Sequence, residues 1–172
     1  MTTSLQPHRT TPEPAVQALT VEAARTTPNG LHLRYRLTAD LEALAIPPAT
    51  DPERADELWR HTCFEAFLRA PGNPAYFELN LSPSGRWAAY RFTAVREGMT
   101  LADIASPEIA VRAGEGALTL DARIDGLPPG AWRLGVSAVI EARDGRLSYW
   151  ALAHPAAKPD FHNPDGFVLE LP

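Results

Sequence analysis

Three consecutive segments between residues 59 and 92 alternate polar or aromatic side chains with apolar ones, as half-buried β-strands do. Alternation places carboxylate, amide, guanidinium and aromatic groups on one face of neighbouring strands, close enough to touch. Carboxylate and amide oxygens accept hydrogen bonds from hydroxyl groups, and aromatic rings pack against sugar C–H groups. The pattern therefore predicts a binding face for a hydroxyl-rich ligand. Its candidate residues are Glu65, Tyr76, Glu78, Asn80, Trp87 and Arg91.

Two other interpretations of this face remain open. It could be a solvent-exposed sheet surface with a Glu–Arg pair, which would contribute little to stability. It could also be catalytic, with Glu65 and Glu78 acting as the carboxylate pair of an enzyme that acts on sugars. A β-sandwich with only two such residues is more often a binder, so we expect a non-catalytic module for a carbohydrate or a sugar-containing small molecule.

The proline-rich segment from residue 149 to residue 165 carries a second group of candidate ligand-binding side chains. Its prolines restrict the backbone, and its histidines and carboxylates offer hydrogen-bonding groups. We expect this loop to form one wall of the pocket. The predicted contributors are Trp150, His154, Lys158, Asp160 and His162.

Two cofactors are compatible with these residue types. A divalent metal could take ligands from His154, Asp160, His162 and Asp165, although their spacing matches no standard zinc motif. Haem could be held by Met99 with His61, His154 or His162, although no C-x-x-C-H attachment motif is present. Hydrogen bonds that order the loop are the alternative role for these groups, and no cofactor is required by the pattern.

Ten short segments with strand-like composition would have to position these side chains. Glycine- and proline-rich breakers separate them, and Asp144-Gly145 gives the strongest hairpin signal. They predict an all-β fold, an antiparallel β-sandwich of immunoglobulin-like or jelly-roll type. The segments are Ala18–Ala24, Leu31–Thr38, Thr62–Leu68, Ala75–Leu81, Trp87–Thr93, Glu108–Ala113, Ala117–Ile124, Ala131–Glu141, Leu147–Leu152 and Phe167–Leu171.

One or two short helices are expected beside these strands. Residues 51–60 begin with Asp-Pro, which suits an N-cap followed by proline at the first helical position. Residues 101–105 predict a second, single turn.

Length and composition indicate one domain in a chain of 172 residues. Residues 1–14 are polar and proline-rich and predict a flexible tail, which leaves 15–172 for the sandwich domain. The net charge of −5 argues against nucleic acid or an anionic membrane as the main partner. A single cysteine allows no intrachain disulfide, and no secretory signal or membrane-spanning run is evident, so a cytoplasmic location is expected. Oligomeric state is left open.

Four motifs give the chain a resemblance to a known family: WRHTCFEAF from residue 59, YFELNLSPSGRWAAY from residue 76, YWAL from residue 149 and KPDFH from residue 158. With these motifs the chain resembles DOMON-like proteins, in the bacterial subgroup related to type-9 carbohydrate-binding modules. The resemblance implies a β-sandwich that binds sugar or haem, without a known reaction. The paired tryptophans that clamp sugar in type-9 modules would correspond to Trp87 or Trp150.

Overall fold

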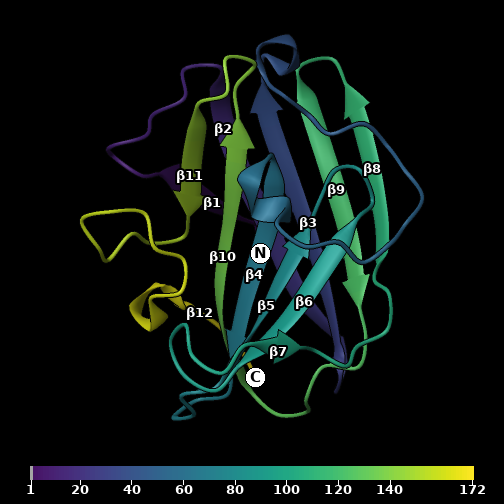
Figure 1. The fold of residues 1–172 in the computed structure, drawn as a ribbon, viewed down its shortest axis with the longest axis vertical. Coiled ribbons are helices and arrows are strands. Elements are labelled where there is room, and N and C mark those ends of the chain that lie inside the picture. The colour runs from purple at the N-terminus through teal and green to yellow at the C-terminus, as the bar shows by residue number, and fades with distance from the viewer. Residues whose placement is uncertain (1) are drawn as a thin grey trace.

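The computed structural model describes residues 2–172, and their strands form a continuous antiparallel sheet that curls into two layers (Figure 1). One layer has the strand order β1-β2-β3-β9-β8. Its bounds are β1 Thr2–Pro7, β2 Val16–Thr27, β3 Gly30–Ala39, β8 Glu108–Gly114 and β9 Ala117–Ile124.

The other layer has the order β7-β6-β5-β4-β10-β11, and β12 pairs with the start of β10. Its bounds are β4 Cys63–Arg69, β5 Tyr76–Leu81, β6 Trp87–Phe92, β7 Thr100–Leu101, β10 Trp132–Glu141, β11 Leu147–Ala151 and β12 Leu169–Leu171. Three single 3-10 turns complete the described elements: η1 Leu41–Ala43, η2 Leu58–Arg60 and η3 Pro164–Gly166. The predicted antiparallel β-sandwich is confirmed, and each of the ten expected strands is present.

Strand β1 joins the two layers and corrects the expectation of a flexible tail over residues 1–14. Its first part, Thr2–Leu5, pairs with β2, and its last two residues pair with β11. Leu5 is 2% exposed and anchors the strand in the core. Polar composition suggested a tail, but threonine has high β-propensity, and pairing first with β2 and then with β11 satisfies the backbone of β1. Met1 lies outside the described residues.

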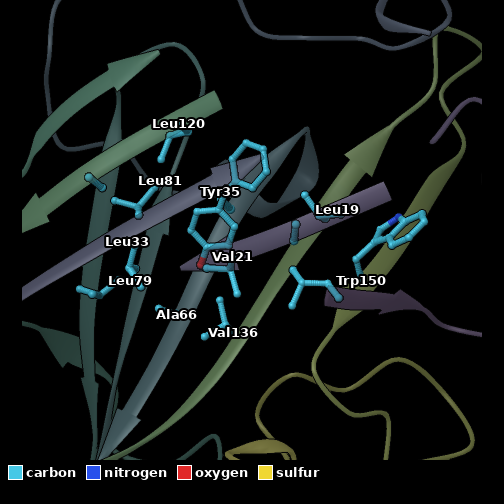
Figure 2. Packing of buried hydrophobic residues seen from close by; sticks show 14 of the residues in the cluster. Leu19, Val21, Leu33, Tyr35, Ala66, Leu79, Leu81, Leu120, Val136 and Trp150 are labelled. Atoms are coloured by element: carbon cyan, nitrogen blue, oxygen red, sulfur yellow. The ribbon is translucent and has the colours of Figure 1, made fainter. Parts of the chain in front are cut away.

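The apolar core fills the space between the layers (Figure 2). Leu33 and Tyr35 on β3 face Ala66 on β4 and Leu79 on β5 across it. The Tyr35 hydroxyl donates a 2.7 Å hydrogen bond to the backbone carbonyl of Glu65 and so links the layers. Because side chains alternate, the residues of β4 and β5 that flank these core positions point to the outer face of their layer.

The two predicted helices are absent from the described residues. Within 51–60, only η2 is helical, while Glu53 and Ala55 exchange backbone hydrogen bonds with Trp87 at the start of β6. Thr100–Leu101 forms the short strand β7, which pairs with β6. In both places, pairing with a sheet edge satisfies the backbone and overrides the local helix signal. Within 2–172, no helical segment has the length and apolar character needed to span a bilayer.

Candidate functional site

A cleft of about 770 Å³ lies on the outer face of the layer that contains β4, β5 and β6. Strands β4, β5, β6, β10 and β11 form its floor, and three segments (56–59, which reaches into η2, 96–101, which ends in β7, and the loop 159–162) form its walls. The floor residues are Glu65, Phe67, Glu78, Tyr90, Phe92, Val139 and Tyr149. The wall residues are Asp56, Glu57, Trp59, Arg96, Met99, Thr100, Leu101, Pro159, Asp160, Phe161 and His162.

Two buried carboxyl groups occupy the floor of the cleft. Glu65 is 3% exposed and Glu78 is 6% exposed. Glu65 pairs in register with Asn80, and Phe67 pairs with Glu78, so the two glutamates are diagonal neighbours on adjacent strands. Asn80 Nδ2 donates a 2.9 Å hydrogen bond to Glu78 Oε1. The Glu65 carboxyl has no hydrogen-bond or ion-pair partner within residues 2–172 and is open to a ligand.

Burial controls the ionisation of both carboxyl groups. Loss of solvent raises the pKa of Glu65 well above its ordinary value, and the nearby charge of Glu78 raises it further. Loss of solvent also raises the pKa of Glu78, while the hydrogen bond from Asn80 opposes this rise. The floor therefore favours the neutral form of at least one carboxyl group when the cleft is empty.

His162 presents a defined hydrogen-bond donor beside Glu78. The Tyr76 hydroxyl accepts a hydrogen bond from the Arg96 backbone N–H at 3.1 Å and lies 2.7 Å from His162 Nδ1. Because the Tyr76 hydroxyl proton has no other acceptor among the described residues, we assign it to the bond with Nδ1, which leaves the ring proton on Nε2. Nε2 lies 3.7 Å from Glu78 Oε2. Burial lowers the pKa of His162 to about 4, assisted by the charge of Arg96, so the ring is neutral near pH 7.

Arg96 ties two walls of the cleft together. Its guanidinium Nη2 donates a 2.8 Å hydrogen bond to Asp160 Oδ1, which also accepts the backbone N–H of His162 at 3.1 Å. The ion pair is half-exposed and contributes little energy by itself. Arg96 also has a φ of 59°, a conformation that a side chain with Cβ rarely adopts. Its backbone bond to Tyr76 and its ion pair with Asp160 hold the backbone in that conformation at the mouth of the cleft.

Apolar and aromatic groups surround the mouth of the cleft. Trp59 is 45% exposed, and Met99 and Leu101 are each more than 60% exposed. Tyr149 and Phe161 meet edge to face, with ring centroids 5.9 Å apart. Exposed apolar groups that gather around a polar floor are typical of a ligand-binding surface.

Six of the predicted site residues lie in or directly beneath the cleft: Glu65, Tyr76, Glu78, Asn80, Asp160 and His162. Tyr76 and Asn80 are buried and support the residues that line it. Of the predicted residues, the carboxyl pair and the loop segment from Asp160 to His162 therefore lie at one cleft.

Trp87 and Arg91 were assigned to the wrong face of their strand. Glu78 pairs with Tyr90, so Tyr90 shares the outer face, and Trp87 belongs to the core with the Arg54 guanidinium 4.2 Å from its ring centroid. Arg91 lies on the same face of β6 as Trp87, opposite to the cleft, and its side chain is exposed. Alternation fixes the two faces within a strand, but a shift of one residue in register exchanges them.

Three residues of the predicted wall also lie elsewhere. Trp150 packs in the core, where its indole N–H donates to Ser148 Oγ at 2.9 Å (Figure 2). His154 Nε2 lies 2.8 Å from the carbonyl oxygen of Gln6, away from the cleft, and Lys158 is exposed. In the part of the chain that the structure describes, no three His, Cys, Asp or Glu side chains gather as metal ligands would.

Sequence reasoning missed most of the walls. Trp59 lies on η2 beside the first strand of the motif region, and its exposure depends on how that turn packs. Arg96 and Met99 come from a loop with no recognisable binding motif. Tyr90 and Phe92 could have been identified by considering the alternative phase of β6, because both are aromatic and share one face.

No family model and no curated protein matches the chain. Among solved structures, a Bacteroides uniformis protein assigned as carbohydrate-binding has a TM-score of 0.68 at 16% identity, over 98% of this chain and 84% of that one. A family 9 carbohydrate-binding module from Caldicellulosiruptor kristjanssonii, in complex with glucose, has a TM-score of 0.52 at 12% identity, over 89% of this chain and 74% of that one. The chain has a fold like that of family 9 carbohydrate-binding modules (a CBM9-like fold).

The same Caldicellulosiruptor module in complex with cellotriose gives a TM-score of 0.51 at 10% identity, over 89% of this chain and 75% of that one. At these identities the likeness concerns the fold alone. Function depends on the side chains of the site, so the chemistry of the cleft has to be argued from its own residues.

Proposed function

We propose that the protein is a non-catalytic carbohydrate-binding module whose ligand lies in the cleft on the outer face of β4, β5 and β6. The observation that carries the proposal is the buried, unpartnered carboxyl of Glu65 at the floor of a cleft with an aromatic and apolar mouth. Sugars need both surfaces, since their hydroxyl groups require polar partners and their C–H faces require apolar ones. The CBM9-like fold and the sugar complexes of its structural neighbours support the same ligand class.

Specific polar groups would orient such a ligand. Glu65 and Glu78 offer carboxyl oxygens, and His162 Nε2–H offers a donor beside them. Trp59 has the exposure needed for a sugar ring to pack against it. Burial raises the pKa of both carboxyls, although Asn80 and Arg96 oppose the rise at Glu78, whereas a glycosidase pair keeps one carboxylate ionised in a polar, partly solvated setting. Binding is therefore favoured over hydrolysis.

Calorimetric titration with a panel of mono- and oligosaccharides tests this function. We expect Trp59→Ala and Glu78→Gln each to weaken binding at least tenfold, because each removes a group that touches the ligand. Arg91→Ala and Glu108→Gln are matched controls, since both residues are exposed and lie outside the cleft lining. Unchanged affinity in both cleft variants, or equal losses in the controls, would contradict the assignment of the site.

A finer assignment within the proposal is kinship to DOMON-like proteins, some of which bind haem. Met99 and His162 both line the cleft and could in principle supply axial ligands. His162 Nδ1 is bonded to the Tyr76 hydroxyl and Nε2 faces the Glu78 carboxyl at 3.7 Å, so coordination of iron would cost one of these contacts. We therefore place sugar before haem. Titration with haemin, followed by the Soret band, should give no spectrum of a six-coordinate His–Met complex.

A further inference from the structure

The carboxyl groups of Glu65 and Glu78 are the main polar groups on the cleft floor that are open to a ligand. Ser137, Glu65 and Asn80 are neighbours in register across β10, β4 and β5. The Glu65 carboxyl lines the cleft and makes no hydrogen bond within residues 2–172, and beneath the lining Ser137 Oγ and Asn80 Oδ1 are buried without a partner in the same part of the chain. Glu78 Oε2 has only the distant Nε2–H of His162, at 3.7 Å. A ligand that fits this floor must bring donors to it.

The charged groups around the cleft are mostly acidic and also favour a ligand that donates hydrogen bonds. Five carboxyl groups line it, and Arg96 is the single guanidinium in the lining of the described chain. Arg96 is already bonded to Asp160, and burial keeps His162 neutral near pH 7. The carboxyl groups belong to Asp56, Glu57, Glu65, Glu78 and Asp160. The field in the cleft therefore attracts a cation and repels an anionic sugar.

We propose that the ligand carries an amine and that the ammonium form of this amine binds between Glu65 and Glu78. The preferred sugars are then hexosamines. This inference rests on the proposed carbohydrate-binding function. An ammonium group has three N–H donors and no acceptor, which matches the oxygens of ionised Glu65 and Glu78, whereas a hydroxyl group needs partners of both kinds. The aromatic mouth would then contact the C–H face of the sugar ring.

The ionisation of Glu65 should change when such a cation binds. Glu65 resists ionisation because it is buried beside a second carboxyl. A bound ammonium supplies the missing counter-charge and favours the ionised carboxylate, so binding should release a proton from the floor. A neutral sugar supplies no charge and should release none.

Calorimetry of the full chain at pH 7 with glucosamine, glucose, N-acetylglucosamine and glucuronic acid tests the inference. We expect glucosamine to bind at least tenfold more tightly than glucose, N-acetylation to remove this preference, and glucuronic acid to bind least. Glu65→Gln should abolish the preference for glucosamine over glucose, and Glu108→Gln, outside the cleft lining, should retain it. Titrations of wild-type protein in buffers of different ionisation enthalpy should show proton release with glucosamine alone, which needs no variant.

The outcomes separate this inference from the function on which it rests. Equal affinity for glucosamine and glucose, without proton release, overturns the amine preference and leaves carbohydrate binding in place. Binding of a non-sugar amine such as cyclohexylamine, with no sugar bound, overturns carbohydrate binding and upholds amine recognition. Absence of binding by sugars and amines alike overturns both.

Discussion

Replacing Glu65 by glutamine should stabilise the fold while it impairs the site. Glu65 is a carboxyl group that is 3% exposed, has no partner within residues 2–172 and lies beside Glu78. Glutamine has nearly the same shape but cannot ionise. Its amide also brings two donors next to Asn80 Oδ1, which is a buried acceptor without a partner in the described chain.

The size of the effect follows from the raised pKa of Glu65. The folded protein keeps a proton on this carboxyl over a pH range in which the unfolded chain, with a pKa near 4.5, has released it. Stability of the wild type therefore falls as pH rises from about 4.5 to the folded-state pKa, at up to about 1.4 kcal/mol per pH unit. Each kcal/mol of stability corresponds to roughly 2–4 °C in Tm for a chain of this length. Glu78 remains in the variant and keeps a smaller slope of the same sign.

Urea unfolding at pH 5, 6, 7 and 8 measures this difference. We expect the stability gain of Glu65→Gln over wild type to increase with pH, and Glu108→Gln, at an exposed strand position, to follow the wild type. Residues that lower the stability of the fold are common in binding sites, because selection there acts on ligand binding and not on stability. A variant that is less stable than wild type at every pH would refute the reasoning, since it would make Glu65 a structural residue.

Three further predictions test other parts of the structure. Trp87→Ala should lower the free energy of unfolding by about 3–5 kcal/mol, because the indole is in the core, and should leave the affinity of the folded protein unchanged; lost affinity at full stability would restore Trp87 to the site. Tyr76→Phe should cost about 1–3 kcal/mol in urea unfolding and speed hydrogen exchange at the Arg96 amide, which loses its acceptor; unchanged exchange would contradict the bridge. Because burial lowers the pKa of His162 to about 4, the unfolded chain binds a proton first, so wild-type stability should fall between about pH 6.5 and pH 4. His162→Gln should flatten that part of the curve, and an equal acid slope in the variant would show that another group titrates.

The strands could be predicted from sequence because their signal is local. Alternation and turn residues recur within a few positions, so each of the ten expected segments became a strand. β1 was missed because its place depends on partners far away in the chain, namely β2 and β11. Residues 51–60 carried a local helix signal that pairing with β6 overrides.

The site was predictable only where one strand or one loop determines it. The shared face of Glu65 and Glu78 follows from alternation and simple pairing, and the rigid loop delivers Asp160 and His162 to the same cleft. The phase of β6 depends on its register after the turn, which the alternation within that strand cannot fix, and Trp87 was misplaced as a result. The walls around Trp59 and Arg96 depend on tertiary contacts between loops, for which the sequence has no short pattern.

The central claim is that sugar binds in the cleft on the outer face of β4, β5 and β6, and tryptophan indole signals test it most directly. Of the four tryptophans in the sequence, Trp59 alone lines the cleft in the part of the chain that the structure describes, while Trp87, Trp132 and Trp150 are buried. In a ¹H–¹⁵N correlation titration with the best-bound sugar, the Trp59 indole signal should shift in proportion to occupancy and the three core signals should stay in place. A saturable titration in which Trp59 does not move would contradict the claim.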